Sequence, residues 1–174
     1  MKRTDIKSMP DYFDRYINLV SDIDLYEAFE NSLKDIEALE LTTIDRIGTK
    51  TYQPNKWTIK EILQHITDIE RLLTAGTLRF ARDESDFVIA FDENKIARQS
   101  KANKRSIEQI LEELTSVRYA TIALFKTFDK DDFQKSGINW KHRISIEAMG
   151  FNIIGHQIHH FRFIENNYYP LIKK

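Results

Sequence analysis

Apolar residues recur every three to four positions along most of the chain, which is the spacing of amphipathic helices. One stripe consists of Ile59, Ile62, Ile66, Ile69, Leu73 and Phe80. Thr58 and Glu61 stand just before it with the spacing of a capping box, in which each side chain bonds the backbone of the other residue. The pattern therefore predicts a long helix that starts after Thr58 and runs to about Arg82.

Three further stripes predict long helices from about Asp24 to Ile47, from Ser106 to Phe128 and from Arg143 to Tyr168. Ser106 and Gln109 form a second capping box at the start of one of them. A shorter apolar group predicts a short helix from Asp11 to Val20, which leads into the main body.

The two longest connections lack this periodicity. Residues 83–103 contain the apolar run Phe87 to Phe91, which predicts a strand-like or irregular crossover, and a short helix from Glu93 to Gln99 fits the next segment. Residues 133–142 predict a loop or an irregular turn. Four long helices with one long crossover predict an all-α four-helix bundle, and the length predicts a single domain over residues 1–174.

Composition excludes several classes of function. The 174 residues contain no cysteine, which rules out disulfides, thiolate zinc sites and cysteine nucleophiles. The formal net charge is -1 with both signs interspersed, so we expect no nucleic acid or membrane partner. No apolar run is long enough to span a membrane, and no apolar leader follows the first residues. We therefore expect a cytoplasmic protein.

Three of the five histidines fall within five consecutive positions, 156–160. On a helix, His156 and His160 are one turn apart, about 6 Å along the axis, and both replace apolar residues in the inward stripe. Buried imidazoles need partners, so either they are hydrogen-bonded core residues or they share a metal ion. His159 points about 100° away from His160, and His142 fits a packing role.

His65 lies at the edge of the inward stripe of its own helix and is the natural third ligand. A bundle core brings side chains from facing helices together, so His65, His156 and His160 can bind one divalent ion. Three protein ligands leave a position open, which is typical of catalytic and not of structural sites. Imidazoles alone do not select among zinc, nickel, iron(II), manganese and copper.

Several polar residues lie within a helical turn of these ligands. Glu61, Asp68, Asn152 and His159 are candidates for orienting an imidazole or assisting the reaction, although the capping box already explains Glu61. Arg118 interrupts an apolar part of its helix and either binds an anionic substrate group or pairs with an acidic neighbour. No known catalytic motif marks a nucleophile or general base, so the catalytic residues stay unassigned.

Three segments together resemble the DinB-like superfamily, which includes the YfiT-type metal-dependent hydrolases. They are Met9–Phe13 followed by Tyr16 and Ile17, Trp57–Ile66, and Gly155–His160. The resemblance implies an up-down-down-up four-helix bundle in which three histidines hold a divalent metal. It assigns those positions to His65, His156 and His160, the three residues that helix geometry also selects.

The resemblance leaves the reaction open. Our leading hypothesis is a metal-dependent hydrolase that activates water against a small-molecule substrate. A second is a transferase or isomerase that uses a low-molecular-weight thiol such as bacillithiol or mycothiol. A third is a stress-associated binding protein without catalytic activity. Because relatives are often homodimers, the resemblance also implies a homodimer.

Overall fold

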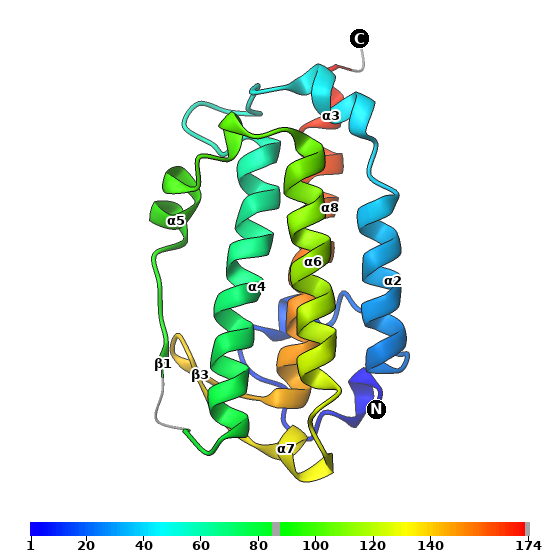
Figure 1. Ribbon diagram of the computed structural model, residues 1–174, viewed down its shortest axis with the longest axis vertical. Helices are drawn as coiled ribbons and strands as arrows, with labels where there is room; N and C mark the ends of the chain where they lie inside the picture. Colours follow the sequence, from blue (N-terminus) through cyan, green and yellow to red (C-terminus); the bar gives the residue numbers. More distant parts are fainter. Residues whose placement is uncertain (85–87, 173–174) are drawn as a thin grey trace.

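The computed structural model describes residues 1–84 and 88–172. Four long helices run along one axis: α2 (Leu25–Glu37), α4 (Ile59–Ala81), α6 (Ile107–Phe125) and α8 (Ile146–Asn167). Figure 1 shows that α4 and α6 run in one direction and that α2 and α8 run in the other. The long connection between α4 and α6 makes this parallel pair possible. The predicted up-down-down-up bundle is confirmed.

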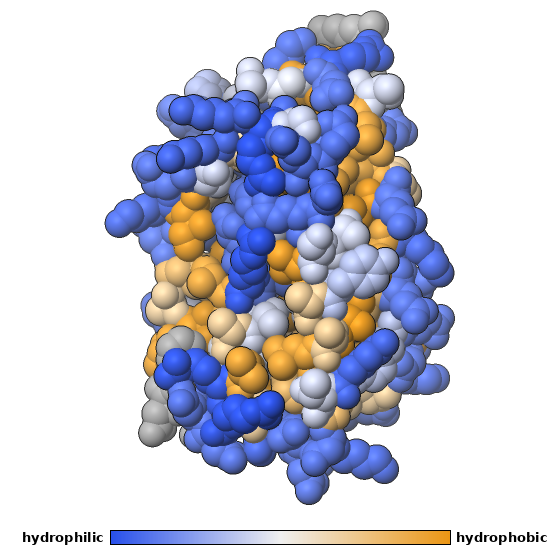
Figure 2. Space-filling view, in the orientation of Figure 1, coloured by the Kyte–Doolittle hydropathy of each residue, from blue (hydrophilic) through white to orange (hydrophobic). Residues whose placement is uncertain are grey.

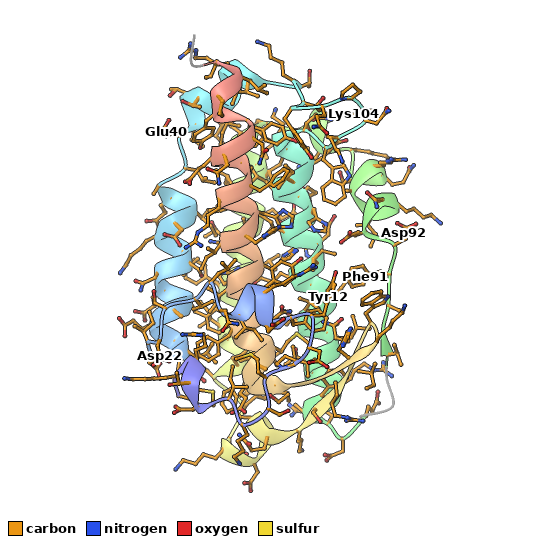
Figure 3. All side chains as sticks on the ribbon, turned by 180° about the vertical axis from the view of Figure 1, so that it is seen from behind. Tyr12, Asp22, Glu40, Phe91, Asp92 and Lys104 are labelled. Carbon is orange, nitrogen blue, oxygen red and sulfur yellow. The ribbon has the colours of Figure 1, made fainter. Side chains whose placement is uncertain are left out.

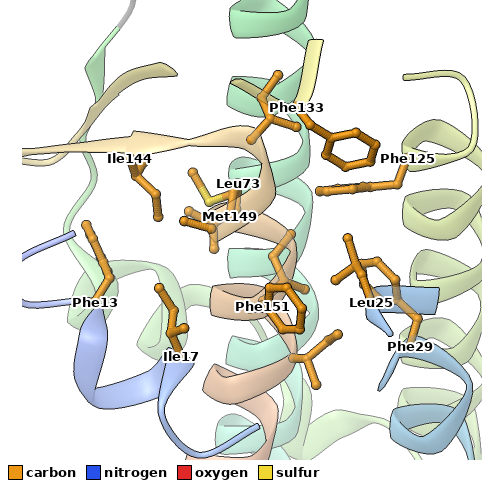
Figure 4. Packing of buried hydrophobic residues seen from close by; sticks show 14 of the residues in the cluster. Phe13, Ile17, Leu25, Phe29, Leu73, Phe125, Phe133, Ile144, Met149 and Phe151 are labelled. Carbon is orange, nitrogen blue, oxygen red and sulfur yellow. The ribbon is translucent and has the colours of Figure 1, made fainter. Parts of the chain in front are cut away.

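Each of the four helices packs on two others: α4 contacts α6 and α8, and α2 contacts the same two helices. Two apolar clusters fill the interior, one toward each end. Figure 4 shows part of the first cluster, in which the Phe125 ring lies near those of Phe29 and Phe133. Between the clusters lies a layer of buried polar residues, one from each helix: Ser32, Glu70, Arg118 and Gln157.

Both predicted capping boxes are present, at Thr58 before α4 and at Ser106 before α6. The single helix predicted from Asp24 to Ile47 is wrong, because α2 ends at Glu37 and α3 (Leu41–Ile47) follows after a break. The break turns the chain across the end of the bundle, where α3 buries two isoleucines in the second apolar cluster. A helix buries an apolar stripe only along its own axis. The chain must therefore change direction before α3 can cover the end of the bundle.

The remaining helix ends also differ from the prediction. The N-terminal helix is shorter than expected, since α1 covers only Asp14–Ile17. Helix α6 ends at Phe125 instead of Phe128, and α8 begins at Ile146, where the Ser145 side chain caps it by accepting a bond from the Ala148 N–H. The described residues also form three short 3-10 turns: Arg3–Asp5, Ala102–Lys104 and Tyr169–Leu171.

The crossover contains β1 (Val88–Ile89) and α5 (Glu93–Gln99), both as predicted, while Phe87 lies outside the described residues. The loop predicted at residues 133–142 is wrong. Helix α7 (Lys130–Gln134) is followed by two antiparallel strands, β2 (Ser136–Asn139) and β3 (His142–Ser145), and β1 pairs with β2 in parallel. This small sheet packs against α4.

Most of the face formed by α4 and α6 is hydrophilic in its upper half (Figure 2). Apolar side chains reach the surface in the lower half of that face, and exposed residues include Leu72 and Leu78 of α4 and Tyr119 of α6. Among the described residues, no helix combines the length and apolarity needed to cross a membrane.

Candidate metal centre

His65 of α4 and His156 and His160 of α8 come together where these two helices face each other. Each offers a ring nitrogen, and the three nitrogens lie within 4.8 Å of one another. The Nε2 atoms of His156 and His160 are 3.1 Å apart. Two nitrogens bound to one tetrahedral ion at 2.1 Å lie about 3.4 Å apart. The cluster therefore has the size of a single-ion site.

The histidines are held in the neutral form that binds metals. His65 is 1% exposed and His156 is 9% exposed. Burial lowers the pKa of His65 to about 4, because the charged imidazolium loses its hydration. Burial also holds the pKa of His156 and of His160 well below the usual range, and the neighbouring imidazoles add to this effect. All three rings are therefore uncharged at neutral pH.

The hydrogen bonding of the cluster is incomplete without a bound group. Nδ1 of His65 is buried and has no hydrogen-bond partner among the described residues. The contact between His156 and His160 is the one hydrogen bond that joins cluster imidazoles in this part of the chain. Buried polar atoms in native proteins are normally satisfied. Three neutral imidazoles and an unpartnered nitrogen fit a divalent first-row ion.

Helix α1 covers the cluster from the side of α8. Gly155 makes this possible, because a Cβ atom there would lie 2.0 Å from the carbonyl oxygen of Tyr16. The Tyr16 ring meets His156 edge to face, with ring centres 5.3 Å apart, and its hydroxyl accepts a hydrogen bond from Arg15. The glycine beside the histidine motif thus brings an aromatic wall against the cluster.

A first cavity of about 280 Å³ opens onto His65 and His156. Its wall includes Tyr12 and Tyr16 from the N-terminal segment and Phe91 and Asp92 from the crossover. Figure 3 shows Tyr12 beside Phe91, with Asp92 at the start of α5. The crossover between α4 and α6 therefore helps to enclose the space next to the histidines.

A second cavity of about 340 Å³ lies against His160 and His159. Lys56 and Arg98 line it, and Glu93 of α5 lines both cavities. The first cavity has carboxylates but no lysine or arginine among its described lining residues. Two cavities therefore lie against the histidine cluster, and their lining residues differ in charge.

The four residues predicted to assist the metal ligands occupy different environments. Glu61 accepts a hydrogen bond from the backbone N–H of Thr58, in its capping role, and the carboxylate of Asp68 accepts one from Gln64. His159 is exposed, and its ring lies edge to face against His160. Asn152 lines the first cavity together with His65 and His156. In the described chain none of these four donates to or accepts from a cluster imidazole.

Arg118 pairs with an acidic neighbour, which is the second of the two roles predicted for it. Its side chain is 0% exposed, and its Nε and Nη2 atoms donate to the two carboxylate oxygens of Glu70 at 2.8 and 2.9 Å. It also donates to the hydroxyl of Ser32. This geometry favours a core ion pair over a contact with substrate.

Sequence patterns did not identify the cavity walls. Tyr12, Tyr16, Phe91, Asn139 and Trp140 come from segments far apart in the chain, and only the packing of α1, the crossover and the sheet brings them together. The one available signal is the group of aromatic residues at positions 12–16, whose pattern predicts only a short leading helix.

The fold has a relative of known structure. YfiT from Bacillus subtilis, described as a probable metal-dependent hydrolase with an unusual four-helix bundle topology, matches with a TM-score of 0.69. The alignment covers 91% of this chain and 87% of YfiT at 18% sequence identity, which shows a shared fold. No curated protein sequence matches the chain significantly. The family model of the DinB superfamily matches residues 16–164, and the protein therefore belongs to the DinB superfamily.

Proposed function

We propose that this protein is a metal-dependent hydrolase that acts on a small molecule. The observation that carries the proposal is the cluster of His65, His156 and His160, three neutral imidazoles of which His65 and His156 line the first cavity and His160 lines the second. The description of YfiT as a probable metal-dependent hydrolase supports the same class of reaction. The ion is one of zinc, nickel, iron(II) or manganese, since all of these accept imidazole nitrogen.

The chain's own groups have distinct tasks in this proposal. The three histidines would hold the ion, and three protein ligands are typical of sites that also admit water or substrate. A divalent ion in such a site supplies Lewis acidity, which lowers the pKa of a water molecule or polarises a carbonyl oxygen. Tyr12, Tyr16 and Phe91 enclose the adjoining cavity, which limits the access of bulk water to the substrate.

The experiment that tests the proposal is metal analysis by mass spectrometry on protein purified without a chelator or an affinity tag. We expect about one divalent ion per chain in the wild type and none in His65→Ala or His156→Ala. His142→Gln is the matched control, because His142 lies in β3 outside the cluster. Metal-dependent hydrolysis is then screened on ester and amide substrates. A metal-free wild type, even after incubation with zinc, nickel and manganese, would reject the proposal.

The second cavity favours one alternative function. It places Lys56 and Arg98 on the side of His160, and neither forms an ion pair with another described residue. Such a space fits an anionic co-substrate, as the thiol-dependent transferase or isomerase hypothesis requires. Turnover that needs an added thiol, such as bacillithiol, and consumes it would establish this alternative and reject simple hydrolysis.

The third candidate, a binding protein with a structural metal, predicts a closed coordination sphere. Cobalt(II)-substituted protein distinguishes the two cases, because its visible spectrum changes when an added ligand such as azide enters an open position. We expect the spectrum to change. The homodimer implied by the family resemblance and the cytoplasmic location expected from the sequence stay predictions, to be checked by sedimentation and by cell fractionation.

A further inference from the structure

The first cavity contains two buried side-chain amides. Asn152 of α8 is 2% exposed, its Oδ1 has no hydrogen-bond partner among the described residues, and its Nδ2 reaches only the sulfur of Met149 at 3.8 Å. Asn139, at the end of β2, is also buried and lines the same cavity. A buried amide without a partner destabilises the folded state. Because Asn152 lines the cavity beside the histidines and its amide is unsatisfied, we take the missing partner to be a ligand bound there.

The mouth of this cavity has two aromatic residues with unusual backbones. Tyr12 has φ 70° and Trp140 has φ 56°, in the left-handed region, and their ring centres are 5.2 Å apart. Trp140 is the first residue of the two-residue turn between β2 and β3, where a positive φ normally selects glycine. Bulky residues in such conformations concentrate at functional sites. Trp140 is 44% exposed, so core packing does not explain its ring.

The charges around the cavity disfavour an anionic ligand. Asp92 and Glu93 line it, and no lysine or arginine does so in the described chain. Two cations lie on aromatic rings of the lining instead of in it: Arg15 is 3.8 Å from the Tyr12 ring centre and Lys141 is 4.6 Å from that of Trp140. The rest of the lining includes Ile69, Leu73 and Ile89, which favour an apolar body.

We infer that the first cavity binds a neutral small molecule in which a planar amide is attached to a flat apolar group. The amide of Asn152 offers one donor and one acceptor, which complement the acceptor and donor of another amide. The flat group packs against Tyr12 and Trp140 at the mouth. The cavity volume of about 280 Å³ limits the ligand to a small molecule.

The inference rests on the proposed function in one respect, since it places the ligand's amide beside the histidine cluster and so identifies the bond that is hydrolysed. In that reaction water adds to the carbonyl carbon, the C–N bond breaks and the leaving nitrogen gains a proton. The products are a carboxylic acid and an amine. Binding itself does not require the metal.

The test measures binding of benzamide and benzoate to metal-free protein by ligand-detected NMR titration. These probes have the same ring, but one is a neutral amide and the other an anion. Stripping the metal prevents the carboxylate from gaining affinity by ligation and separates this test from the metal analysis. We expect benzamide to bind at millimolar concentration or below, and to bind more tightly than benzoate.

Two variants locate the binding site. Asn152→Leu keeps the side-chain size and removes the hydrogen bonds, so we expect benzamide affinity to fall about tenfold. Trp140→Gly relieves the positive φ and removes the ring, so we expect a folded protein with weaker binding of the same probe. Asn94→Leu is the control, because the exposed Asn94 lines only the second cavity, and its affinity should equal that of the wild type.

Three outcomes would overturn the inference. One is the absence of benzamide binding to folded wild-type protein. Another is equal affinity for benzamide and benzoate. The third is a loss of affinity in Asn94→Leu with none in Asn152→Leu and Trp140→Gly, which would place the ligand in the second cavity. If benzamide binds as expected but no ion is found, the proposed function fails while the amide site stands.

Discussion

The backbone carbonyl of Tyr16 lies against the Cα of Gly155, so closely that a Cβ atom on residue 155 would be 2.0 Å from the carbonyl oxygen. Helix α1 therefore approaches α8 at the one place where α8 has no side chain between Phe151 and His156. The Tyr16 ring, which extends over His156, depends on this approach. A backbone contact between the short helix α1 and the long helix α8 thus determines what covers the candidate metal centre.

We predict that Gly155→Ala displaces α1 and destabilises the protein by about 1–3 kcal/mol, the usual cost of overpacking a core. The clash is with backbone atoms, which cannot rotate away. Urea unfolding measures the change. Gly150→Ala is the matched control, because a Cβ atom there meets only side-chain atoms of Phe125 and Leu25 at 2.9–3.0 Å. An equal loss in both variants would contradict the special role of the α1 contact.

Metal binding should depend on the cluster while folding should not. We predict that His156→Ala loses stoichiometric metal but keeps most of its helical circular dichroism signal, since both apolar clusters remain. In the wild type, zinc at one hundred times its dissociation constant should add about 2.7 kcal/mol to the free energy of unfolding. The increase should be absent in His156→Ala and present in His142→Gln. Collapse of the dichroism signal would make the histidines primarily structural.

The stability of metal-free protein should fall as the pH drops from about 6.5 toward 4. The folded-state pKa of His65 is about 4, below the value of 6.5 for an exposed imidazole, so in this range the unfolded state binds the proton first. The shift of His65 alone corresponds to about 3 kcal/mol at the acidic end of the range. His156 and His160 change stability in the same direction, because burial lowers the pKa of both.

Urea unfolding of metal-free protein at several pH values between 7.5 and 5 measures this dependence, above the range in which most carboxylates titrate. His65→Gln should show a shallower pH dependence than the wild type, because its side chain binds no proton in either state. A slope in the wild type equal to that of His65→Gln would show that His65 is not held neutral by burial.

Periodic patterns predicted the bundle and the histidine cluster because both depend on which face of a helix a residue occupies. Ile62 and Ile69 mark the inward face that carries His65, and Ile153 marks the one that carries His156. These features are local, and a single sequence contains them. The directions of the helices, by contrast, were implied only by the resemblance to the DinB-like superfamily.

Other features depend on contacts between distant segments. The break after Glu37 occurs without glycine or proline, and it is favoured by burial of Ile44 and Ile47 over the end of the bundle. Strand β2 has only four residues, and its pairing with β1 joins segments about 50 positions apart. This sheet places Trp140 in the lining of the first cavity. No local sequence pattern predicts a pairing between strands so far apart in the chain.

The buried ion pair between Arg118 and Glu70 provides the last prediction. Both side chains are at most 2% exposed, and they cross the core between α6 and α4. Arg118→Met should cost about 3–5 kcal/mol, because it leaves a buried carboxylate without its partner. Adding Glu70→Leu should recover most of that loss, since an apolar pair of similar volume needs no compensation.

Arg79→Met is the control for this comparison, because Arg79 pairs with Glu84 at the surface and its removal should cost at most about 1 kcal/mol. Chemical unfolding of the four proteins measures the differences. If Arg118→Met were as stable as the wild type, the ion pair would not hold the core together. Arg118 would then return as a candidate for binding an anionic substrate group, and a raised KM with unchanged stability would establish that role.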